Sequence, residues 1–416
     1  MKLGREILLI VDSIDVNSSS GAKANVALIK NLNDAGFDLK VYHYSKKQIE
    51  LEGIECIAAK EIKLSIFYLL SRLQRFFTRI TKLNINPKVE AIFGFSFTFF
   101  NDVNSFKRAI RSANLEDYDK VLTLSYASSF RPHKAILEIP KWHTKWWAYI
   151  HDPYPMHSYP RPYDWVEPGH KYKRKFFLEI VKKASKMVYP SQLLAGWMQS
   201  YYHNQKGKEI IIPHQIASTI VNEKDLPDFF NPERFNVLHA GNMMSARNPK
   251  ELIEAFQLFL VENPEAKEVS SLLFVGNASV FDDFIKEQQK QTSQLFLSKG
   301  SMPYHKVLTM QFYASVNVIL EAKGAISPFL PGKFPHCVQA DKPILLLGPY
   351  YSESKRLLGD DYKFWSEIDD INRIKDCIKQ LFYEWKHNKG KAKLNRKDLE
   401  VYMSSEYLRN NFKNKP

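Results

Sequence analysis

Residues 7–42 read ILLIVDSIDVNSSSGAKANVALIKNLNDAGFDLKVY. The first five of these residues are continuously aliphatic, as expected of a parallel strand that is buried on both faces. After a polar loop, Val26, Ile29 and Leu32 recur at the spacing of a helix, and Leu39–Tyr42 reads as a second strand. Because strand, helix and strand in this order form a βαβ unit, the stretch predicts an α/β fold built on a doubly wound parallel sheet.

The same alternation continues along the chain in two series. In the first series, further strands are expected at Lys120–Leu124, Trp146–Ile150 and Lys186–Tyr189. In the second, strands are expected at Phe235–Gly241, Ser271–Gly276, Val316–Leu320 and Pro343–Gly348, with a helix at Pro249–Glu262. A single hydrophobic core stops growing at about 250–300 residues. A chain of 416 residues with two such series therefore predicts two domains.

The predicted domains are an N-terminal Rossmann-like domain at residues 1–215 and a C-terminal Rossmann-like domain at residues 235–416. Residues 216–234, which are rich in Asn, Asp and Pro, form the predicted hinge. The last helix is expected to pack back on the N-terminal domain. Ligands of such sheets bind at the carboxyl ends of the strands, so the two domains are expected to face a shared cleft.

The charge of the chain is unevenly distributed. Lys and Arg number 59 against 45 Asp and Glu, a net charge of +14, and residues 1–234 hold 34 of the basic and 24 of the acidic residues. This excess predicts an anionic partner, chiefly for the N-terminal half. No helix-turn-helix, RRM or zinc-finger pattern accompanies it, so we expect no nucleic-acid partner.

Cysteine usage and apolar runs indicate the compartment. Cys56, Cys337 and Cys377 are far apart and form no CxxC pair, which disfavours a disulfide framework or structural zinc. The apolar run at residues 7–11 is too short for a signal-peptide core, and no run of about 18 apolar residues follows, so we expect no transmembrane helix. These features predict a cytoplasmic protein.

Two loops of the second series are suited to phosphate. Gly241–Pro249 joins a strand end to a helix start and carries Arg247, while Gly324–His336 carries Lys333 just before an expected helix. Free backbone N–H groups and a cation at a strand end suit a diphosphate. Each loop also reads as an ordinary turn with a solvated cation, and that alternative stays open. Neither matches GxxxxGK[ST] or GxGxxG, which disfavours P-loop NTPases and nicotinamide enzymes.

A third loop follows the strand at Trp146–Ile150. It begins with His151 and Asp152 and continues through a stretch rich in Tyr and Pro, on which a sugar ring could stack. The histidine is suited to hydrogen bonding with a hydroxyl or to proton transfer. A structural histidine bonded to a nearby carbonyl is an equal alternative. The spacing of these residues matches no metal site, so we predict no metal ligands.

A fourth segment, Ile62–Ile80, has the pattern of a basic amphipathic helix. Apolar residues recur along one stripe, and Arg72, Arg75, Arg79 and Lys82 along another. This pattern suits contact with anionic lipid, and residues 171–175 add a second basic cluster. We therefore predict a peripheral membrane contact through 62–82 and 171–175. In the alternative, the apolar stripe packs on the sheet and the arginines are merely solvated.

Taken together, the loops resemble those of the GT-B glycosyltransferases, in particular the large retaining family 4-like group that includes bacterial capsule and lipopolysaccharide enzymes. The matching segments, spread over almost the whole chain, are Ser18–Ala22, His151–Asp152, Ala184–Ser191, Ile212–His214, Ala240–Asn242, Arg247–Asn248, Ser327–Lys333 and Ala340–Ile344. Three positions depart from the family pattern. Asn242 stands where the family has its first phosphate-binding arginine, His336 where it has the ribose-binding glutamate, and only Gly21 remains of its glycine-rich first loop.

The resemblance implies a GT-B fold and a metal-independent, retaining hexosyltransferase that needs no cofactor. Its donor would be a nucleotide-sugar, and its acceptor a hydroxyl of a glycan or lipid-linked molecule in cell-surface polysaccharide synthesis. The implied catalytic residues are His151, Arg247 and Lys333. The implied donor-binding residues are Gly241, Asn242, Asn248, Gly276, Pro303, Ser327, Pro328, Phe329, Leu330 and His336. The implied acceptor-binding residues are Ser19, Ser20, Gly21, Asp152 and Tyr154.

Two alternative functions remain open. A nucleotide-sugar 2-epimerase of the same fold would need acidic proton-transfer residues, for which Asp152 is a candidate. A non-catalytic nucleotide-sugar-binding protein is favoured by the loss of the ribose-binding glutamate at His336. The predicted location is the cytoplasm, with a position on the inner face of the membrane where the basic segments bind lipid.

Overall fold

The computed structural model describes residues 6–217 and 221–413 and divides the chain into two compact units. The N-terminal unit comprises the described residues up to Tyr159, Tyr163–Gln215 and those from Ser404 onward. The C-terminal unit comprises Pro160–Pro162 and the described residues of Ile216–Met403. Both are α/β units with a parallel main sheet, as the sequence predicts.

The N-terminal unit is built on a seven-stranded sheet of order β3-β2-β1-β4-β5-β6-β7. Every neighbouring pair is parallel. The strands are β1 Glu6–Val11, β2 Asp38–His43, β3 Glu55–Ala58, β4 Lys120–Leu124, β5 Trp146–Tyr149, β6 Lys186–Tyr189 and β7 Glu209–Ile211. The strands expected from aliphatic runs in this half are all present, because continuous apolar sequence is what a sheet covered on both faces requires.

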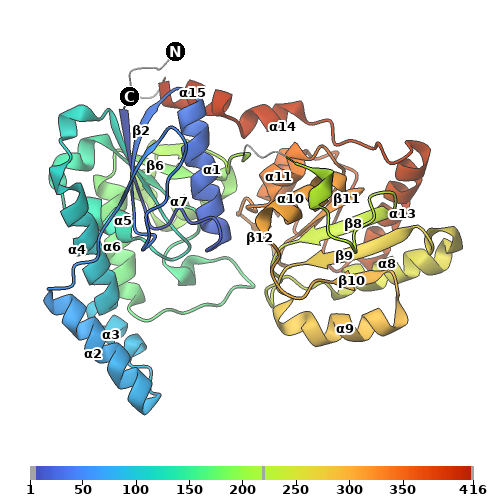
Figure 1. Cartoon of the computed structure of the whole chain (residues 1–416), viewed down its shortest axis with the longest axis horizontal. Coiled ribbons are helices and arrows are strands. Elements are labelled where there is room, and N and C mark those ends of the chain that lie inside the picture. Colours follow the sequence, from blue (N-terminus) through green and yellow to red (C-terminus); the bar gives the residue numbers. More distant parts are fainter. Residues whose placement is uncertain (1–5, 218–220, 414–416) are drawn as a thin grey trace. The chain divides into compact units, whose positions relative to one another are not determined.

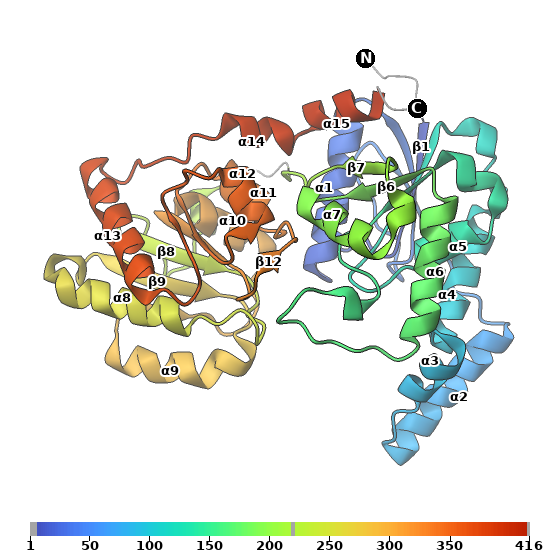
Figure 2. The same ribbon diagram turned by 180° about the vertical axis from the view of Figure 1, so that it is seen from behind.

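Helices cover both faces of this sheet (Figures 1 and 2). The helices are α1 Ser20–Asp34, α2 Ile66–Thr81, α3 Asn86–Phe93, α4 Phe97–Ala109, α5 Arg131–Leu137, α6 His170–Lys183, α7 Gln192–Tyr201 and α15 Ser405–Lys413. Side chains of α1 and α15 share one buried cluster with the sheet, and those of α4, α5, α6 and α7 share another. Phe412 of α15 lies against Phe37 and Trp147, with ring centroids 5.6 Å and 4.9 Å away.

The C-terminal unit is built on a six-stranded parallel sheet of order β10-β9-β8-β11-β13-β15. Its strands are β8 Phe235–Ala240, β9 Ser270–Val275, β10 Leu295–Leu297, β11 Val316–Leu320, β13 Ile344–Leu347 and β15 Trp365–Ser366, and β12 Ile326–Ser327 pairs separately with β14 Tyr351–Ser352. Its helices are α8 Lys250–Glu262, α9 Asp282–Gln291, α10 Tyr304–Tyr313, α11 Phe334–Gln339, α12 Glu353–Leu358, α13 Ile371–His387 and α14 Lys397–Tyr402.

The strand order of the C-terminal sheet indicates where a ligand is expected to bind. The chain runs outward from β8 through β9 to β10, and then returns to the other side of β8 with β11. In sheets of this kind, the loops that leave two such neighbouring strands diverge and open a crevice at the carboxyl edge. In the C-terminal unit these are the loops after Ala240 and after Leu320. Within the described residues, no helix is both long and apolar enough to cross a membrane.

Candidate functional site

Two glycines at the carboxyl edge of the C-terminal sheet bring backbone segments close together. Gly241 follows β8 with φ +150°, and a Cβ on it would lie 3.2 Å from both Cε and Nζ of Lys333. Gly276 follows β9 with φ +136°, and a Cβ on it would lie 2.5 Å from the carbonyl oxygen of Gly241. The positive φ therefore favours glycine at both positions, and at Gly276 the close backbone of Gly241 also leaves no space for a side chain. The lysine from one predicted phosphate loop thus lies directly on the glycine of the other.

The side chain of Lys333 is half-buried, and its ammonium has no ion-pair partner in the described part of the chain. Its Nζ is buried and makes no hydrogen bond within the described part of the chain. Burial lowers the pKa of Lys333 to about 7, and the nearby positive charge of Arg247 acts in the same direction. An unpaired ammonium is costly to bury. An anion bound beside Gly241 would remove that cost, and so the arrangement favours an anionic ligand.

Arg247 and His239 complete the positive side of this site. The Nε of Arg247 is also buried without a hydrogen-bond partner among the described residues. His239, in β8, lies beside the same glycine, and a Cβ on Gly241 would be 4.0 Å from its Cε1. Burial, followed by the charges of Lys333 and Arg247, lowers the pKa of His239 well below its ordinary value. The histidine is therefore neutral, and the two cations carry the charge.

An acidic residue that sequence reasoning missed lies at the end of β11. Glu321 is 4% exposed, and its Oε1 accepts a 2.5 Å hydrogen bond from the Ser354 hydroxyl. Burial raises the pKa of Glu321 to about 7, although Ser327, Ser354 and Arg247 act in the opposite direction. A Cβ on Gly348, at the end of β13, would lie 2.8 Å from the Glu321 Cβ. The sequence gives only one signal for Glu321, namely its position directly after the predicted strand Val316–Leu320.

Several of the predicted donor-binding residues have structural partners. Asn242 Oδ1 accepts a hydrogen bond from the Asn277 N–H at 3.0 Å, and Asn248 Oδ1 accepts one from the Lys250 N–H at 3.2 Å. The bond from Asn248 thus reaches the first residue of α8, Lys250, and its contact with a donor remains a prediction. Pro303 precedes the first residue of α10, Tyr304. His336 is buried, and its Nε2 lies 2.9 Å from the Tyr304 hydroxyl oxygen.

The remaining donor-loop residues divide between site and core. Ser327 and Pro328 are buried and Phe329 is half-buried, and Ser327 is hydrogen-bonded to Glu321. Leu330 is 3% exposed and packs in the hydrophobic cluster that contains Phe334. The Leu330 side chain is therefore part of the core, and a donor contact through the backbone of Leu330 remains a prediction.

In the N-terminal unit, His151 is held in one tautomer. Its Nε2 lies 2.8 Å from Oδ1 of Asn25, a buried residue of α1, while Asn25 Nδ2 donates to the carbonyl of Ser125. The amide oxygen can only accept, so Nε2 of His151 carries the proton. Burial, and then the His214 and His133 rings, lower the pKa of His151 well below its ordinary value. His151 is therefore neutral, and its Nδ1 makes no hydrogen bond among the described residues.

The predicted acceptor residues of the first loop have local structural roles. Ser19 caps α1, its hydroxyl accepting a hydrogen bond from the Ala22 N–H at 3.1 Å. Ser20 is the first residue of that helix. A Cβ on Gly21 would make an ordinary 3.6 Å contact with the Tyr126 ring, so nothing there requires glycine. Any acceptor contact by these residues remains a prediction.

The two acceptor residues after β5 differ. Asp152 is half-buried, and its contact with an acceptor remains a prediction. Tyr154 is 1% exposed and packs in the core, with its ring centroid 4.1 Å from that of Phe130. The stacking role predicted for Tyr154 is therefore wrong, because no face of its ring is open to a sugar.

A second charged network at the carboxyl edge of the N-terminal sheet was not foreseen. Asp12, which follows β1, accepts a 2.5 Å hydrogen bond from the Ser129 hydroxyl and is 7% exposed. Arg131 Nε lies 2.9 Å from Asp102 Oδ2, and its Nη1 donates to Ser129 Oγ at 2.6 Å. Burial raises the pKa values of both aspartates, and Arg131 lowers them. Unlike Lys333, these groups satisfy one another.

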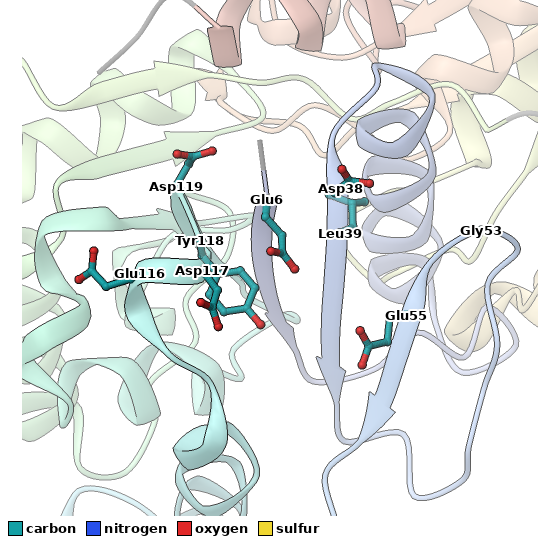
Figure 3. A pocket seen from close by; sticks show the side chains of 9 residues that line it. All are labelled: Glu6, Asp38, Leu39, Gly53, Glu55, Glu116, Asp117, Tyr118 and Asp119. Carbon is teal, nitrogen blue, oxygen red and sulfur yellow. The ribbon is translucent and has the colours of Figure 1, made fainter. Parts of the chain in front are cut away.

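The opposite edge of the N-terminal sheet carries an acidic pocket of about 580 Å³ (Figure 3). Its carboxylates lie at the amino ends of the strands, from Glu6 at the start of β1, Asp38 at the start of β2 and Glu55 at the start of β3. Lys40 Nζ lies 2.9 Å from Glu55 Oε1 and neutralises part of this charge. Such a surface repels a diphosphate. No cluster of three or more His, Cys, Asp or Glu within the described residues is arranged to hold a metal ion.

Comparison with known proteins gives structural neighbours only. No family model and no curated protein matches the sequence, so the family 4-like resemblance stays a prediction. The N-terminal domain of Candida albicans trehalose-6-phosphate phosphatase matches with a TM-score of 0.63 at 14% identity, covering 99% of this chain and 97% of its own. A Burkholderia xenovorans UDP-forming α,α-trehalose-phosphate synthase in complex with glucose-6-phosphate matches with a TM-score of 0.61 at 10% identity, covering 98% and 99%.

A third neighbour is an E. coli structure described as trehalose-6-phosphate bound with UDP-2-fluoro glucose. It matches with a TM-score of 0.58 at 10% identity and covers 98% of each chain. At these sequence identities the likeness concerns the fold, and it extends over nearly the full length of this chain and of each of the three neighbours. The chain accordingly has the GT-B fold of two Rossmann-like units that its sequence motifs led us to expect.

Proposed function

We propose that the protein is a glycosyltransferase that moves a sugar from a nucleotide-sugar to an acceptor hydroxyl. The observation that carries this proposal is the buried, unpartnered Nζ of Lys333 against Gly241, with Arg247 as a second cation nearby. Two cations at the carboxyl edge of a doubly wound sheet form a preorganised site for a diphosphate.

The chemistry follows from where charge develops. When the bond between the anomeric carbon and the diphosphate breaks, negative charge grows on the departing phosphate oxygens. Lys333 and Arg247 would stabilise that charge without reorganisation, which is the largest demand of such a reaction. With two protein cations in this role, the proposed reaction needs no metal ion. Retention of the anomeric configuration is proposed from the family resemblance.

His151 supplies a different contact. Its Nδ1 is an acceptor with no partner among the described residues, and its pKa is too low for it to act as a cation. We assign it to a hydrogen bond from a hydroxyl of the transferred sugar. A neutral acceptor of this kind orients a sugar and adds no charge that would compete with the cations around Gly241.

Two structural neighbours support a nucleotide-sugar donor and a sugar acceptor. One structure is bound with UDP-2-fluoro glucose, and another is a complex with glucose-6-phosphate. For this chain we propose a glycan or lipid-linked acceptor in cell-surface polysaccharide synthesis, and contact with the inner face of the membrane. The support is the basic N-terminal half and the exposed side chains of 62–82.

The second basic cluster is smaller than the sequence predicted. Lys171, Arg174 and Lys175 are exposed, but Lys173 is buried. Its Nζ is paired with Glu90 Oε2 at 2.8 Å and with Glu167 Oε2 at 2.7 Å. The prediction that Lys173 contributes to a membrane contact is therefore wrong, because its charge is neutralised inside the unit.

The test is incubation of the full chain with a panel of UDP-, GDP-, ADP- and dTDP-sugars, with glucose-6-phosphate or a lipid-linked glycan as acceptor. Release of nucleoside diphosphate with a new glycosidic bond supports the proposal, and the active arm identifies both substrates. Formation of the 2-epimer of a donor would establish the epimerase alternative. Binding of donors without turnover on any acceptor would establish a binding protein.

A further inference from the structure

The helix α2 exposes its apolar face to solvent. The exposed large side chains along it include Ile66 at 70%, Phe76 at 63% and Ile80 at 64%, together with Leu69, Leu73 and Phe77. Counted from Ile66, they recur at i+3, i+7, i+10, i+11 and i+14, so they form one stripe. Only Ser71 of this helix is fully buried. The alternative in which the stripe packs on the sheet is therefore wrong.

Neighbouring residues enlarge the exposed apolar surface. Leu64 and Leu83, which flank the helix, are 98% and 63% exposed, and Ile92 and Phe93 of α3 are 63% and 53% exposed. In the N-terminal unit, α2 and α3 project beyond the ends of α4 and α6 (Figures 1 and 2). A concentration of exposed apolar side chains on a projecting element marks an interaction site.

The projecting helices are fixed to the unit by polar contacts. The Ser65 hydroxyl, which caps α2, donates to Asn101 Oδ1 of α4 at 2.6 Å, and the Phe67 and Phe100 rings stack at 5.2 Å. On the other side, Gln74 donates to Asn86 Oδ1 at 2.9 Å, and Asn86 donates to Glu90 at 2.8 Å. These contacts hold α2 against α4 and α3 and leave the apolar stripe on the exposed side of the helix.

The arrangement of charge indicates what covers the stripe. Arg72 and Arg79 are exposed and lie along the border of the apolar side chains, and Lys82 follows the helix. Arg75 is held by Ser71 through bonds of 3.2 Å and 3.3 Å. Two copies of this chain joined through the stripe would bring these like charges together. Anionic lipid instead offers acyl chains to the stripe and phosphates to the arginines.

We infer that α2 and α3 dock into the surface of an anionic bilayer, with the α2 axis in the membrane plane and the Leu69, Leu73 and Phe76 side chains in the acyl region. This inference deepens the proposed function, since it specifies how the protein would reach a lipid-linked acceptor. Only this link to the acceptor rests on the proposed function. The helix does not cross the bilayer, because its 16 residues include three arginines.

The experiment is co-sedimentation of the full chain with vesicles of equal parts phosphatidylcholine and phosphatidylglycerol. Two variants separate the two contributions. Leu73→Ser/Phe76→Ser removes apolar surface and keeps the charge. Arg72→Gln/Arg79→Gln removes two positive charges and keeps the apolar surface. Val280→Ser is the matched control, because Val280 is an exposed apolar side chain of the C-terminal unit. Vesicle binding needs neither donor nor acceptor, so failure here is distinguishable from failure of the proposed transfer.

We expect Leu73→Ser/Phe76→Ser to weaken vesicle binding by about tenfold or more, since two inserted apolar side chains are lost. The arginine variant should lose several-fold, and the Val280→Ser control should bind as the parent does. Wild-type pelleting by Leu73→Ser/Phe76→Ser would overturn the inference. So would a lipid-free dimer of the parent chain that this variant abolishes, because a second copy would then be what covers the stripe.

Discussion

The carboxyl edges of the two sheets use charge in opposite ways. In the N-terminal unit, Arg131 is paired with Asp12 and Asp102, and the Ser129 hydroxyl accepts a hydrogen bond from Arg131 and donates one to Asp12. In the C-terminal unit, Lys333 Nζ has no partner among the described residues. The charged groups of the first edge are paired with one another, whereas the second edge has positive charge in excess.

The difference shows which edge is prepared for an anion. A satisfied network contributes to the fold and gains little from a charged ligand, whereas an uncompensated buried cation costs stability until an anion binds. The neutral His151 adds a hydroxyl-binding group to the first edge. We therefore expect charge to be essential for turnover only in the C-terminal unit, and the following experiments test that comparison.

The largest effect is expected for Lys333→Ala. Removal of a preorganised contact to developing charge should lower turnover by about 10²-fold or more, read as nucleoside diphosphate released from the active nucleotide-sugar. Lys323→Ala is the matched control, because Lys323 is an exposed lysine of the neighbouring loop that is paired with Asp369. Near-normal turnover of Lys333→Ala would show that the diphosphate lies elsewhere.

Arg131→Ala should instead lower stability. Breaking a fully buried ion pair costs about 3–5 kcal/mol, and because Arg131 keeps 28% of its side chain exposed we expect about 2 kcal/mol. The measurement is the free energy of unfolding of the N-terminal unit in denaturant, with the exposed Arg111→Ala as control. Unchanged stability with lost donor binding would reverse the roles of the two edges.

The affinity for a nucleoside diphosphate should depend on pH. The pKa of Lys333 is about 7, so the lysine is protonated in the free protein below pH 7 and neutral above it. Glu321, with a pKa of about 7, gains negative charge over the same range. Both changes weaken anion binding as pH rises, by up to about tenfold per pH unit for each group.

Calorimetric titrations between pH 6 and 9 would measure this slope. Lys333→Ala should bind the diphosphate weakly, and its affinity should keep only the pH dependence that Glu321 causes. The further change Glu321→Gln should remove that remaining pH dependence. Tighter binding at pH 9 than at pH 6 would contradict the assignment of both groups.

The smallest effect is expected for Asn25→Leu. Loss of one neutral hydrogen bond, worth about 1 kcal/mol, should lower transfer about fivefold. Because Asn25 fixes the His151 tautomer, ¹⁵N spectra of histidine-labelled protein should show a mixture of tautomers in place of the Nε2–H form. Asn31→Leu, a change at another buried asparagine of α1, should leave those spectra unaltered. A single unchanged tautomer in Asn25→Leu would remove Asn25 from this positioning role.

Much of the fold could be predicted because its strands are buried on both faces and read as continuous aliphatic runs. Arg247 and Lys333 were found by the same logic, since each lies in a loop that follows a predicted strand. Glu321 and Asp12 also follow predicted strands, but a lone acid after a strand has no spacing that distinguishes it from a solvated residue.

The corrected predictions fail for a common reason. The aromatic ring of Tyr154 and the ammonium of Lys173 are both consistent with a surface role in the local sequence. Their environment is set by residues far along the chain: Lys173 is paired with Glu90, 83 positions away. Local patterns place a residue on an element, but burial depends on which distant elements pack against it.

Helix α15 has a consequence for how the chain is made. Phe412 and Leu408 complete the cluster that contains Trp147 and Val188, yet residues 216–403 lie between them in the sequence. During synthesis, at about 5–20 residues per second, the N-terminal unit emerges from the ribosome roughly 10–40 seconds before these two side chains do. For that interval, we expect part of the apolar surface around Phe37 and Trp147 to be exposed, because Phe412 lies against both rings in the complete chain.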